Sequence, residues 1–194
     1  MTAFFETPSS GPTAALAAQM RALVPVLETE RLVLRAPCME DFNALADMLL
    51  GPRGKYYGDC KTRDEIWGEF IQVTATWYLS GFGAWTAVDK ATGEIQGFFQ
   101  IGAEPGDHEP ELGYVVSQQA EGKGIAFEAS SAVRDFALDR FELSSLVSYV
   151  DAENTRSVAL ANRLGGKRDT QAEAIVAADG DPCLVFRYAG PEAH

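Results

Sequence analysis

The sequence predicts a mixed α/β domain in which helices flank a twisted β-sheet. Segments that alternate apolar and polar residues, as strands do, interchange with segments in which apolar residues recur at the helical period. Turns rich in glycine and proline separate them. The 194 residues, 46% apolar and 23% charged, suit one domain with a substantial core. The expected order is β-α-α-β-β-β-α-β-α-β-β, which gives about seven strands.

An N-terminal extension over residues 1–25 is expected in front of a domain that spans residues 26–190. Proline, serine and glycine are frequent in residues 1–12, which predicts a loose start. A short amphipathic helix, laid on the domain, is predicted from Thr13 to Val24, where a proline follows. Its apolar positions fall at i, i+4 and i+7, and they are Leu16, Met20 and Leu23.

The first strand and the first two helices come next. The strand is predicted in Leu27–Ala36, where alternate residues point to opposite sides. A helix begins at Pro37, and a loop over Gly51–Asp59 follows it. The second helix begins at Thr62, which forms a capping box with Glu65. Each helix carries an apolar stripe. The stripes are Phe42, Leu45, Ala46 and Leu49 in the first helix, and Ile66, Phe70, Val73 and Trp77 in the second.

The middle of the chain is predicted to form a β-hairpin and then two more strands. The hairpin joins Ala84–Val88 to Glu94–Gly102 through a turn that ends in Gly93. The fourth strand is expected over Glu111–Ser117 and the fifth over Ser145–Val150. A glycine-rich elbow and a helix lie between these two strands. The inward residues of that helix are Ala126, Ala129, Val133, Phe136 and Ala137.

The last third of the chain adds one helix and two strands. The helix starts at Asn154 and ends in two glycines, as a C-terminal cap prefers. Strands are predicted near Lys167–Ile175 and Cys183–Tyr188, on either side of the turn "ADGDP". The inward residues of the helix are Val158, Ala161 and Leu164.

The charge and residue composition argue against several classes of function. Sixteen basic and 28 acidic residues give a formal net charge of −12, which argues against nucleic acid or an anionic membrane as partner. A signal peptide, or an apolar stretch of the roughly 20 residues that span a bilayer, is not expected. Cys38, Cys60 and Cys183 are scattered, which favours reduced thiols in a cytoplasmic protein. With only His108 and His194, a histidine-based metal site or a Ser-His-Asp triad is not expected.

The stretch "EGKGIAFEA", residues 121–129, places two glycines between a strand and a helix. Helix N-termini expose unpaired N–H groups and a partial positive charge, so such an elbow can hold an anion. Gly122 and Gly124 let the backbone approach that anion. A P-loop would need Ser or Thr after Lys123, and a dinucleotide fingerprint would need Gly or Ala at Phe127. Taken alone, the elbow favours an ordinary structural turn.

Five segments together resemble the GNAT superfamily of acyl-CoA N-acyltransferases, in the branch of the ribosomal-protein N-terminal acetyltransferase-like proteins. They are "ETERLVLRAP", "GFGAWTAVDKATGEIQGF", "ELGYVV", "GKGIAFEA" and "NTRSVALANRLG", and they extend over Leu27 to Tyr188. "EGKGIA" is similar to the family's Q/R-x-x-G-x-G/A pyrophosphate loop, with Glu121 at its first position and Ala126 at its last. The resemblance implies the GNAT fold, a mostly antiparallel sheet that splays between the fourth and fifth strands. It also implies acetyl-CoA as co-substrate and no metal.

The same resemblance assigns residues to the co-substrate. The backbone from Gly122 to Ala126 would bind the pyrophosphate of coenzyme A, and the pantetheine arm would lie between the splayed strands like an added strand. The N–H groups of Tyr114 and Val115 would polarise the thioester carbonyl. Asn154 would contact pantetheine, or simply cap its helix. The full cofactor-binding set is Tyr114, Val115, Val116, Glu121, Gly122, Lys123, Gly124, Ile125, Ala126, Asn154 and Ser157. An ordinary solvated side chain is the alternative for Lys123 and for Ser157.

The chemistry needs a neutral amine. An α-amino group with a pKa of about 7.7–8.0 needs little help, whereas a lysine-like amine near about 10.4 needs a base. The resemblance places Glu111 as general base, acting directly or through water; an exposed strand-end glutamate is the alternative. Many relatives carry a proton-donating tyrosine where Ala161 stands, and an aromatic residue where Gly166 stands. The resemblance implies Ser157 near the sulfur instead, or no acid, because a thiol pKa of about 8.5 makes thiolate a tolerable leaving group.

The predicted function is therefore a cytoplasmic N-acetyltransferase acting by direct attack of a primary amine, on a small molecule or a protein N-terminus. A monomer or a homodimer would fit. The acidic composition tilts toward a cationic acceptor, and the loop Gly51–Asp59 is expected to border its site. A non-catalytic acyl-CoA-binding or regulatory module is the rival, left open by Ala161. A nucleotide-binding domain would rest on the elbow alone. Five aromatic residues are assigned mostly to the core, and they are Trp67, Trp77, Tyr78, Phe82 and Trp85.

Overall fold

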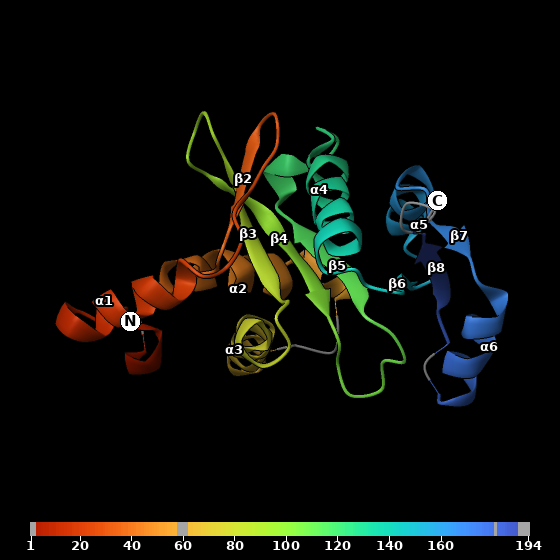
Figure 1. Cartoon of the computed structure of the whole chain (residues 1–194), viewed down its shortest axis with the longest axis horizontal. Helices are drawn as coiled ribbons and strands as arrows, with labels where there is room; N and C mark the ends of the chain where they lie inside the picture. The colour runs from red at the N-terminus through yellow and green to blue at the C-terminus, as the bar shows by residue number, and fades with distance from the viewer. Residues whose placement is uncertain (1–2, 58–61, 181, 190–194) are drawn as a thin grey trace.

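The computed structural model describes residues 3–57, 62–180 and 182–189, and these form an open β-sheet with helices on both sides (Figure 1). The predicted mixed α/β class is confirmed. The strands are β1 Leu27–Glu28, β2 Leu32–Arg35, β3 Ala84–Asp89, β4 Ile95–Gly102, β5 Glu111–Val116, β6 Leu146–Val150, β7 Lys167–Arg168 and β8 Leu184–Tyr188. The α-helices are α1 Gly11–Arg21, α2 Phe42–Leu50, α3 Arg63–Leu79, α4 Ile125–Arg140, α5 Thr155–Arg163 and α6 Thr170–Ala178. Short 3₁₀ turns are η1 Phe4–Glu6, η2 Met39–Asp41, η3 Pro52–Tyr56 and η4 Gln118–Ala120.

The described strands form one eight-stranded sheet in the order β1-β2-β3-β4-β5-β6-β8-β7. Neighbouring strands run antiparallel except β5 and β6, which run parallel. A parallel pair needs a crossover connection, and here α4 supplies it. The crossover leads from the end of β5 through η4 to the start of α4.

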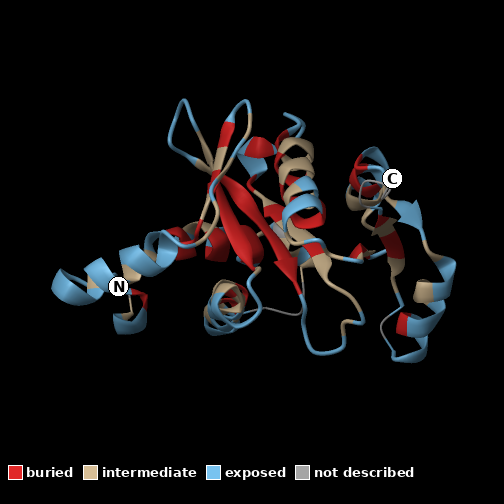
Figure 2. Ribbon diagram, in the orientation of Figure 1, coloured by how far each residue is buried: buried red, intermediate tan, exposed pale blue. Residues whose placement is uncertain are grey.

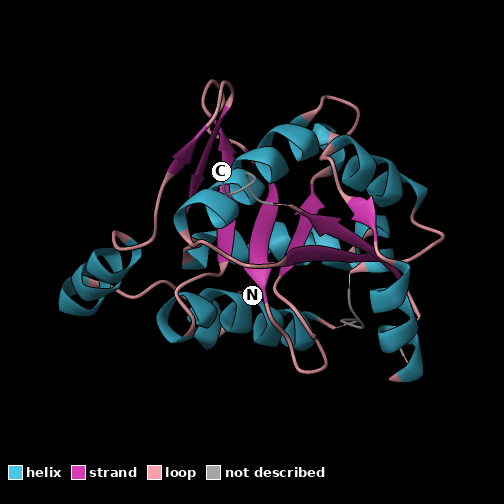
Figure 3. Ribbon diagram, turned by 45° about the vertical axis from the view of Figure 1, so that its right-hand side comes forward, coloured by secondary structure: helices cyan, strands magenta, loops and turns pink. Residues whose placement is uncertain are grey.

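Each face of the central sheet packs against its own helices (Figure 3). Because side chains alternate along a strand, Phe98 and Val115 belong to the core under α2 and α3, whereas Phe99 and Leu112 belong to the core under α4. The central strands are the most deeply buried part of the molecule, whereas β7 at the sheet edge is exposed (Figure 2). This arrangement gives β5 two distinct faces, one toward α3 and one toward α4.

The expected helix signals are confirmed in the structure. The Thr62 side chain accepts from the Glu65 N–H at 3.3 Å, and the Thr62 N–H donates to the Glu65 carboxylate at 2.8 Å. Gly93 closes the β3–β4 turn with a φ of +74°, and Gly165 follows α5 with a φ of +80°. The predicted stripes of α2 and α3 are buried or half-buried. In the expected loop Gly51–Asp59, residues 52–56 form the 3₁₀ turn η3. Positions 58–61, which include Cys60, lie outside the described residues.

The single strand predicted over Leu27–Ala36 is wrong, because these residues form the β1–β2 hairpin. Leu27 pairs with Leu34, and the Thr29 N–H donates to the Leu32 carbonyl at 3.0 Å. A carboxylate from α4, Glu128, accepts from the Thr29 hydroxyl at 2.5 Å and holds the turn. This contact joins residues 99 positions apart, so local periodicity could not reveal it.

The strand predicted near Lys167–Ile175 is also wrong beyond its first two residues. Asp169 caps a helix there, because its carboxylate accepts from the N–H groups of Gln171 and Ala172 at 3.1 and 3.0 Å. The alanines that follow favour helix, and Val176 packs against strands β6 and β8. The resulting α6 covers the outer part of the sheet.

The N-terminal extension differs from its prediction in two ways. Residues 4–6, expected to be loose, form η1 and pack on α3, where the Arg63 guanidinium donates to both Glu6 oxygens at 2.7 and 3.0 Å. The helix α1 does not lie on the domain but projects from it (Figure 1). Its residues Leu16 and Met20 are 58% and 49% exposed, and no residue of α1 is buried.

Candidate active site

Strands β5 and β6 diverge from a single point of contact. Within the described residues, their ladder consists of one register pair, Glu111 with Val147, and the Val147 N–H donates to the Pro110 carbonyl at 3.0 Å. Both neighbouring ladders are longer, since β5 pairs with β4 over six positions and β6 with β8 over five. The predicted splay is therefore confirmed, and it leaves a gap on the β6 side of β5.

Side chains replace ladder hydrogen bonds where the gap begins. The Ser148 hydroxyl donates to the Leu112 carbonyl at 2.7 Å, and the Tyr149 N–H donates to Oε1 of Glu111 at 3.4 Å. Backbone polar groups buried without partners are costly, so these two contacts stabilise the separated strands. Side chains from both strands thus stabilise the gap.

The backbone amides of β5 do not all face this gap. The Leu112 carbonyl faces β6, whereas the Val115 carbonyl faces β4, where a Cβ added to Gly97 would approach it to 2.4 Å. Successive peptide groups of a strand point to opposite sides. The amides of Tyr114 and Val116 therefore face the gap, and the amide of Val115 is directed to β4. The expectation that Val115 also polarises a carbonyl in the gap does not fit this geometry.

The glycine elbow lies between η4 and α4. Gly122 and Gly124 have φ values of +71° and +77°, a left-handed conformation that favours glycine. A Cβ added to Gly122 would meet no described atom within 4 Å, so the space above it is open. Helix α4 begins at Ile125, and its first internal hydrogen bond runs from the Glu128 N–H to the Gly124 carbonyl. The N–H groups of Ile125 and Ala126 precede that bond and are available to an anion.

Arg31 holds the elbow from outside. Its Nη1 donates to the Lys123 carbonyl at 2.8 Å, and its Nε donates to Glu128 at 2.6 Å. Glu128 also accepts from the Arg31 N–H at 2.8 Å, and these bonds hold its pKa below the ordinary value despite burial, which acts in the opposite direction. Sequence reasoning missed this clamp, because its members are 92 to 97 positions apart.

The charged side chains of the elbow face solvent. Glu121, at the position where the family pattern has Gln or Arg, forms an ion pair with Arg156 of α5. Lys123 is exposed. The Glu121–Arg156 pair connects the elbow, which follows β5, to the helix that follows β6.

The first turn of α5 presents Asn154 and Ser157 beside the gap. The Asn154 side-chain oxygen accepts from the Ser157 N–H at 3.2 Å, so Asn154 does cap the helix. The Ser157 Oγ lies 2.8 Å from the Tyr114 hydroxyl. Two predicted site residues, one on β5 and one on α5, are therefore in direct contact.

Glu111 sits at the start of β5 on the face toward α3. Burial raises the pKa of Glu111 to about 8, and the neighbouring carboxylates of Asp107, Glu104 and Glu69 raise it further, against the hydrogen bond from Tyr149. Burial likewise raises the pKa of Glu69 to about 7. Glu111 is half-buried, so it is not the fully exposed strand-end glutamate of the alternative interpretation. A carboxyl group whose pKa lies near the working pH suits a general base.

Glu111 and the Tyr114–Ser157 pair lie on opposite faces of β5. Tyr114 belongs to the core under α4, and Glu111 interacts with Glu69 of α3. A thioester threaded through the gap would meet a base on one face and two hydroxyl groups on the other. An acceptor would therefore approach from the α3 face, and the leaving thiol would turn toward α5.

The loop before α3 borders the face on which Glu111 lies. The Tyr56 hydroxyl donates to the Glu153 carbonyl at 3.5 Å, and the Tyr57 hydroxyl donates to Oε1 of Gln100 at 3.5 Å. The described part of the loop thus reaches from β4 to the segment ahead of α5. Trp67, Trp77, Phe82 and Trp85 pack in the two cores, as expected, whereas Tyr78 is exposed.

Two departures from the family pattern have structural explanations. Ala161 is buried and faces Val150 and Phe186, so this position packs α5 onto the sheet. At Gly166, an added Cβ would lie 2.9 Å from the Ala161 carbonyl and 3.0 Å from the Tyr188 ring. Tyr188 of β8 therefore occupies the space that an aromatic residue at position 166 would need.

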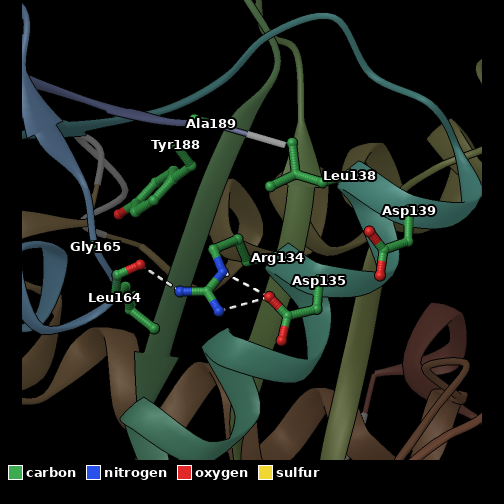
Figure 4. A pocket seen from close by; sticks show the side chains of 8 residues that line it. All are labelled: Arg134, Asp135, Leu138, Asp139, Leu164, Gly165, Tyr188 and Ala189. Carbon is green, nitrogen blue, oxygen red and sulfur yellow. Dashed lines mark hydrogen bonds and ion pairs between the residues drawn. The ribbon is translucent and has the colours of Figure 1, made fainter. Parts of the chain in front are cut away.

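A cavity of about 370 Å³ opens between α4, the end of α5 and the end of β8 (Figure 4). Arg134 on its wall donates to the Leu164 carbonyl and to Asp135. It lies nine residues along α4 from Ile125, roughly 13 Å at 1.5 Å per residue. Arg134 is therefore separate from the elbow, whereas Tyr188 on the same wall contacts Ser148 where the gap begins.

The described residues offer no group of three or more His, Cys, Asp or Glu side chains that could hold a metal ion. Among their helices, none is long and apolar enough to cross a membrane.

An open sheet that parts between two parallel strands, beside a glycine elbow at a helix N-terminus, is the arrangement that the resemblance to the acyl-CoA N-acyltransferases implies. The chain belongs to the GNAT acetyltransferase family, since residues 31–167 match the Acetyltransferase (GNAT) domain. It is similar to an acetyltransferase from Agrobacterium tumefaciens, with 38% identity and a TM-score of 0.79 over 86% of this chain and 95% of that one.

Two further similarities extend the comparison. Uncharacterized protein YkkB of Bacillus subtilis is 30% identical over 149 residues, which cover 72% of this chain and 83% of that protein. The ribosomal L7/L12 α-N-protein acetyltransferase RimL, solved in complex with coenzyme A, shares the fold with a TM-score of 0.63 and 20% identity over 84% of this chain and 96% of that one.

Proposed function

We propose that this protein transfers an acetyl group from acetyl-CoA to a primary amine by direct attack of the amine on the thioester. The observation that carries the proposal is the combination of the open elbow at Gly122 with the gap between β5 and β6. The elbow offers N–H groups to a diphosphate, and the gap offers strand-edge amides to a pantetheine arm. The proposed domain spans residues 26–190.

The co-substrate would be held mostly by the backbone. The amides from Gly122 to Ala126 would bind the pyrophosphate, and Lys123 would add positive charge near it. The gap-facing amides of Tyr114 and Val116 would bind pantetheine as a neighbouring strand does. The side-chain amide of Asn154 would contact pantetheine while its oxygen caps α5.

The reaction would use both faces of β5. Glu111 would accept the proton of the attacking amine, directly or through water, and its pKa of about 8 matches that role. The Tyr114 N–H would donate to the carbonyl oxygen as negative charge develops there. The sulfur would leave on the side of Ser157.

A cationic amine is the acceptor class that we propose. The carboxylates of Glu69, Glu104 and Asp107 lie close enough to Glu111 to raise its pKa, so they form a negative field around the acceptor side. Such a field raises the local concentration of ammonium ions. The acceptor would be a small molecule or a protein N-terminus, the chain a monomer or a homodimer, and the location cytoplasmic.

Calorimetry with coenzyme A, followed by acetyl-CoA turnover against a panel of small amines and N-terminal peptides, tests this function. Binding together with turnover of at least one cationic amine is expected. Binding without turnover across a broad panel, and no rate change in Glu111→Gln, would instead indicate a non-catalytic acyl-CoA-binding module. Absence of coenzyme A binding would refute both functions.

A further inference from the structure

The hydrogen bond between Tyr114 and Ser157 joins the two walls of the gap. Tyr114 projects from β5, and Ser157 projects from the helix that follows β6. Their oxygens lie 2.8 Å apart, and either can be the donor. The Tyr114 ring stacks on Phe99 with 6.1 Å between centroids and an interplanar angle of 18°, which fixes its direction. The phenol is thus held in place by packing and aimed at Ser157.

A second tyrosine–serine pair nearby shows how a purely structural pair differs. Tyr188 and Ser148 are buried, 4% and 6% exposed, with their oxygens 3.1 Å apart. The Ser148 proton is committed to the Leu112 carbonyl at 2.7 Å, so the Tyr188 hydroxyl donates to Ser148. Tyr114 and Ser157 are instead half-buried and face each other across the gap. Their protons can therefore pass to a group that enters the gap.

We propose that the Tyr114 phenol is the proton donor for the departing thiolate and acts through the Ser157 hydroxyl. This inference rests on the proposed acetyl transfer. It supplies the acid that the buried Ala161 cannot, because the phenol approaches the gap from β5 rather than from α5. The contact between the two side chains carries it.

In the proposed step, bonds and protons move in the following order. The amine nitrogen forms a bond to the thioester carbonyl carbon, and the proton it loses passes to Glu111. The C–S bond then breaks and its electron pair stays on sulfur. The sulfur takes the proton of the Ser157 hydroxyl, which takes the phenolic proton of Tyr114. The phenolate regains a proton from solvent, and Glu111 releases one to solvent, before the next turnover.

The test compares Tyr114→Phe with Tyr188→Phe in the full chain. Each variant removes one phenolic hydroxyl that is bonded to a serine, and each keeps its ring. Tyr114→Phe is expected to lower kcat about 100-fold or more, the range of general acid catalysis. The KM for acetyl-CoA and the Kd for coenzyme A should stay unchanged. Tyr188→Phe should keep the parent kcat.

Two further variants test whether the Tyr114 hydroxyl is required and whether it acts together with Ser157. Replacing Tyr114 by 3-fluorotyrosine, which keeps the hydroxyl and is more acidic, should restore kcat. The double variant Tyr114→Phe with Ser157→Ala should be no slower than the slower single variant, because both residues act in one relay.

The outcomes also distinguish this inference from the proposed function. If the parent chain turns over acetyl-CoA and Tyr114→Phe keeps its kcat, or changes only KM or Kd, the relay is wrong and the acetyl transfer stands. Failure of 3-fluorotyrosine to restore kcat in a folded protein that binds coenzyme A also overturns the relay. A parent chain that neither binds coenzyme A nor turns over acetyl-CoA overturns both.

Discussion

Raising the pH from 7 to 9 should accelerate acetyl transfer about tenfold, because Glu111 must lose its proton before it can act as a base. Its carboxyl group is desolvated at the closed end of the gap, and its pKa is about 8. With that pKa, about one tenth of the chains carry the ionised base at pH 7 and about nine tenths at pH 9. A solvated glutamate, with a pKa of about 4.5, would be ionised throughout and would give no such rise.

The assay is kcat/KM for acetyl transfer between pH 6 and 10 under saturating acetyl-CoA. An aliphatic acceptor titrates in the same range, so a weakly basic aromatic amine that stays neutral throughout is the better acceptor. Glu111→Gln is the matched control, since it keeps the shape of the side chain and removes the titration. It should be slower by about 100-fold or more at pH 9 and show a flat profile.

Thermal unfolding gives a second, substrate-independent measure of the same ionisation. Because the folded-state pKa of Glu111 is raised, the folded chain holds this proton more tightly than the unfolded chain does. The stabilisation is complete below the unfolded pKa of about 4.5, declines as the pH rises, and is lost above about 8. The parent should therefore lose Tm relative to Glu111→Gln across that window.

Glu111 is not the titrating base if parent and Glu111→Gln give the same rise of kcat/KM with pH, since the slope then belongs to another group. A flat parent profile from pH 6 upward would likewise mean that the Glu111 carboxylate is solvated in the working enzyme.

Three further changes test the gap and the elbow. Gly97→Ala should lower stability by about 1–3 kcal/mol in urea unfolding, because its Cβ would press on the Val115 carbonyl at 2.4 Å; an unchanged midpoint would contradict that packing. Gly122→Ala should cost about 1–3 kcal/mol through its φ of +71° and should weaken coenzyme A binding in calorimetry; undiminished affinity would mean that the elbow does not hold the diphosphate. Arg156→Ala should weaken coenzyme A binding severalfold. Glu121→Gln should strengthen binding, because this change removes a carboxylate beside the phosphates. If the two changes had equal effects on binding, the ion pair would be merely structural.

Local patterns were sufficient wherever a residue and its partner are close in the chain. Three such features depend only on residues a few positions apart in the chain, and the structure confirms each of them. They are the capping box at Thr62, the hairpin turn at Gly93 and the glycines of the elbow. The interchange of strand and helix periods predicted the class of the fold for the same reason. Periodicity failed at Leu27–Ala36, where the chain forms a hairpin whose turn bonds a carboxylate from α4.

The candidate site was only partly readable in this way. Residue types and a family pattern singled out Glu111, Tyr114 and Ser157. Their arrangement required the sheet, which assigns the amides of β5 to one side or the other and excludes Val115 from the gap. The Arg31 clamp on the elbow left no trace in the sequence.

The sequence by itself determined the mixed α/β class and the elbow that begins α4, and its resemblance to a family indicated which strands part. The class and the elbow follow from short-range sterics and hydrogen bonding, which nearby residues settle. Only the tertiary structure decided that Glu111 is desolvated among other carboxylates and that Tyr114 meets Ser157 across the gap. Desolvation and contact depend on which distant segments pack together, because electric fields and hydrogen bonds act through space and not along the chain.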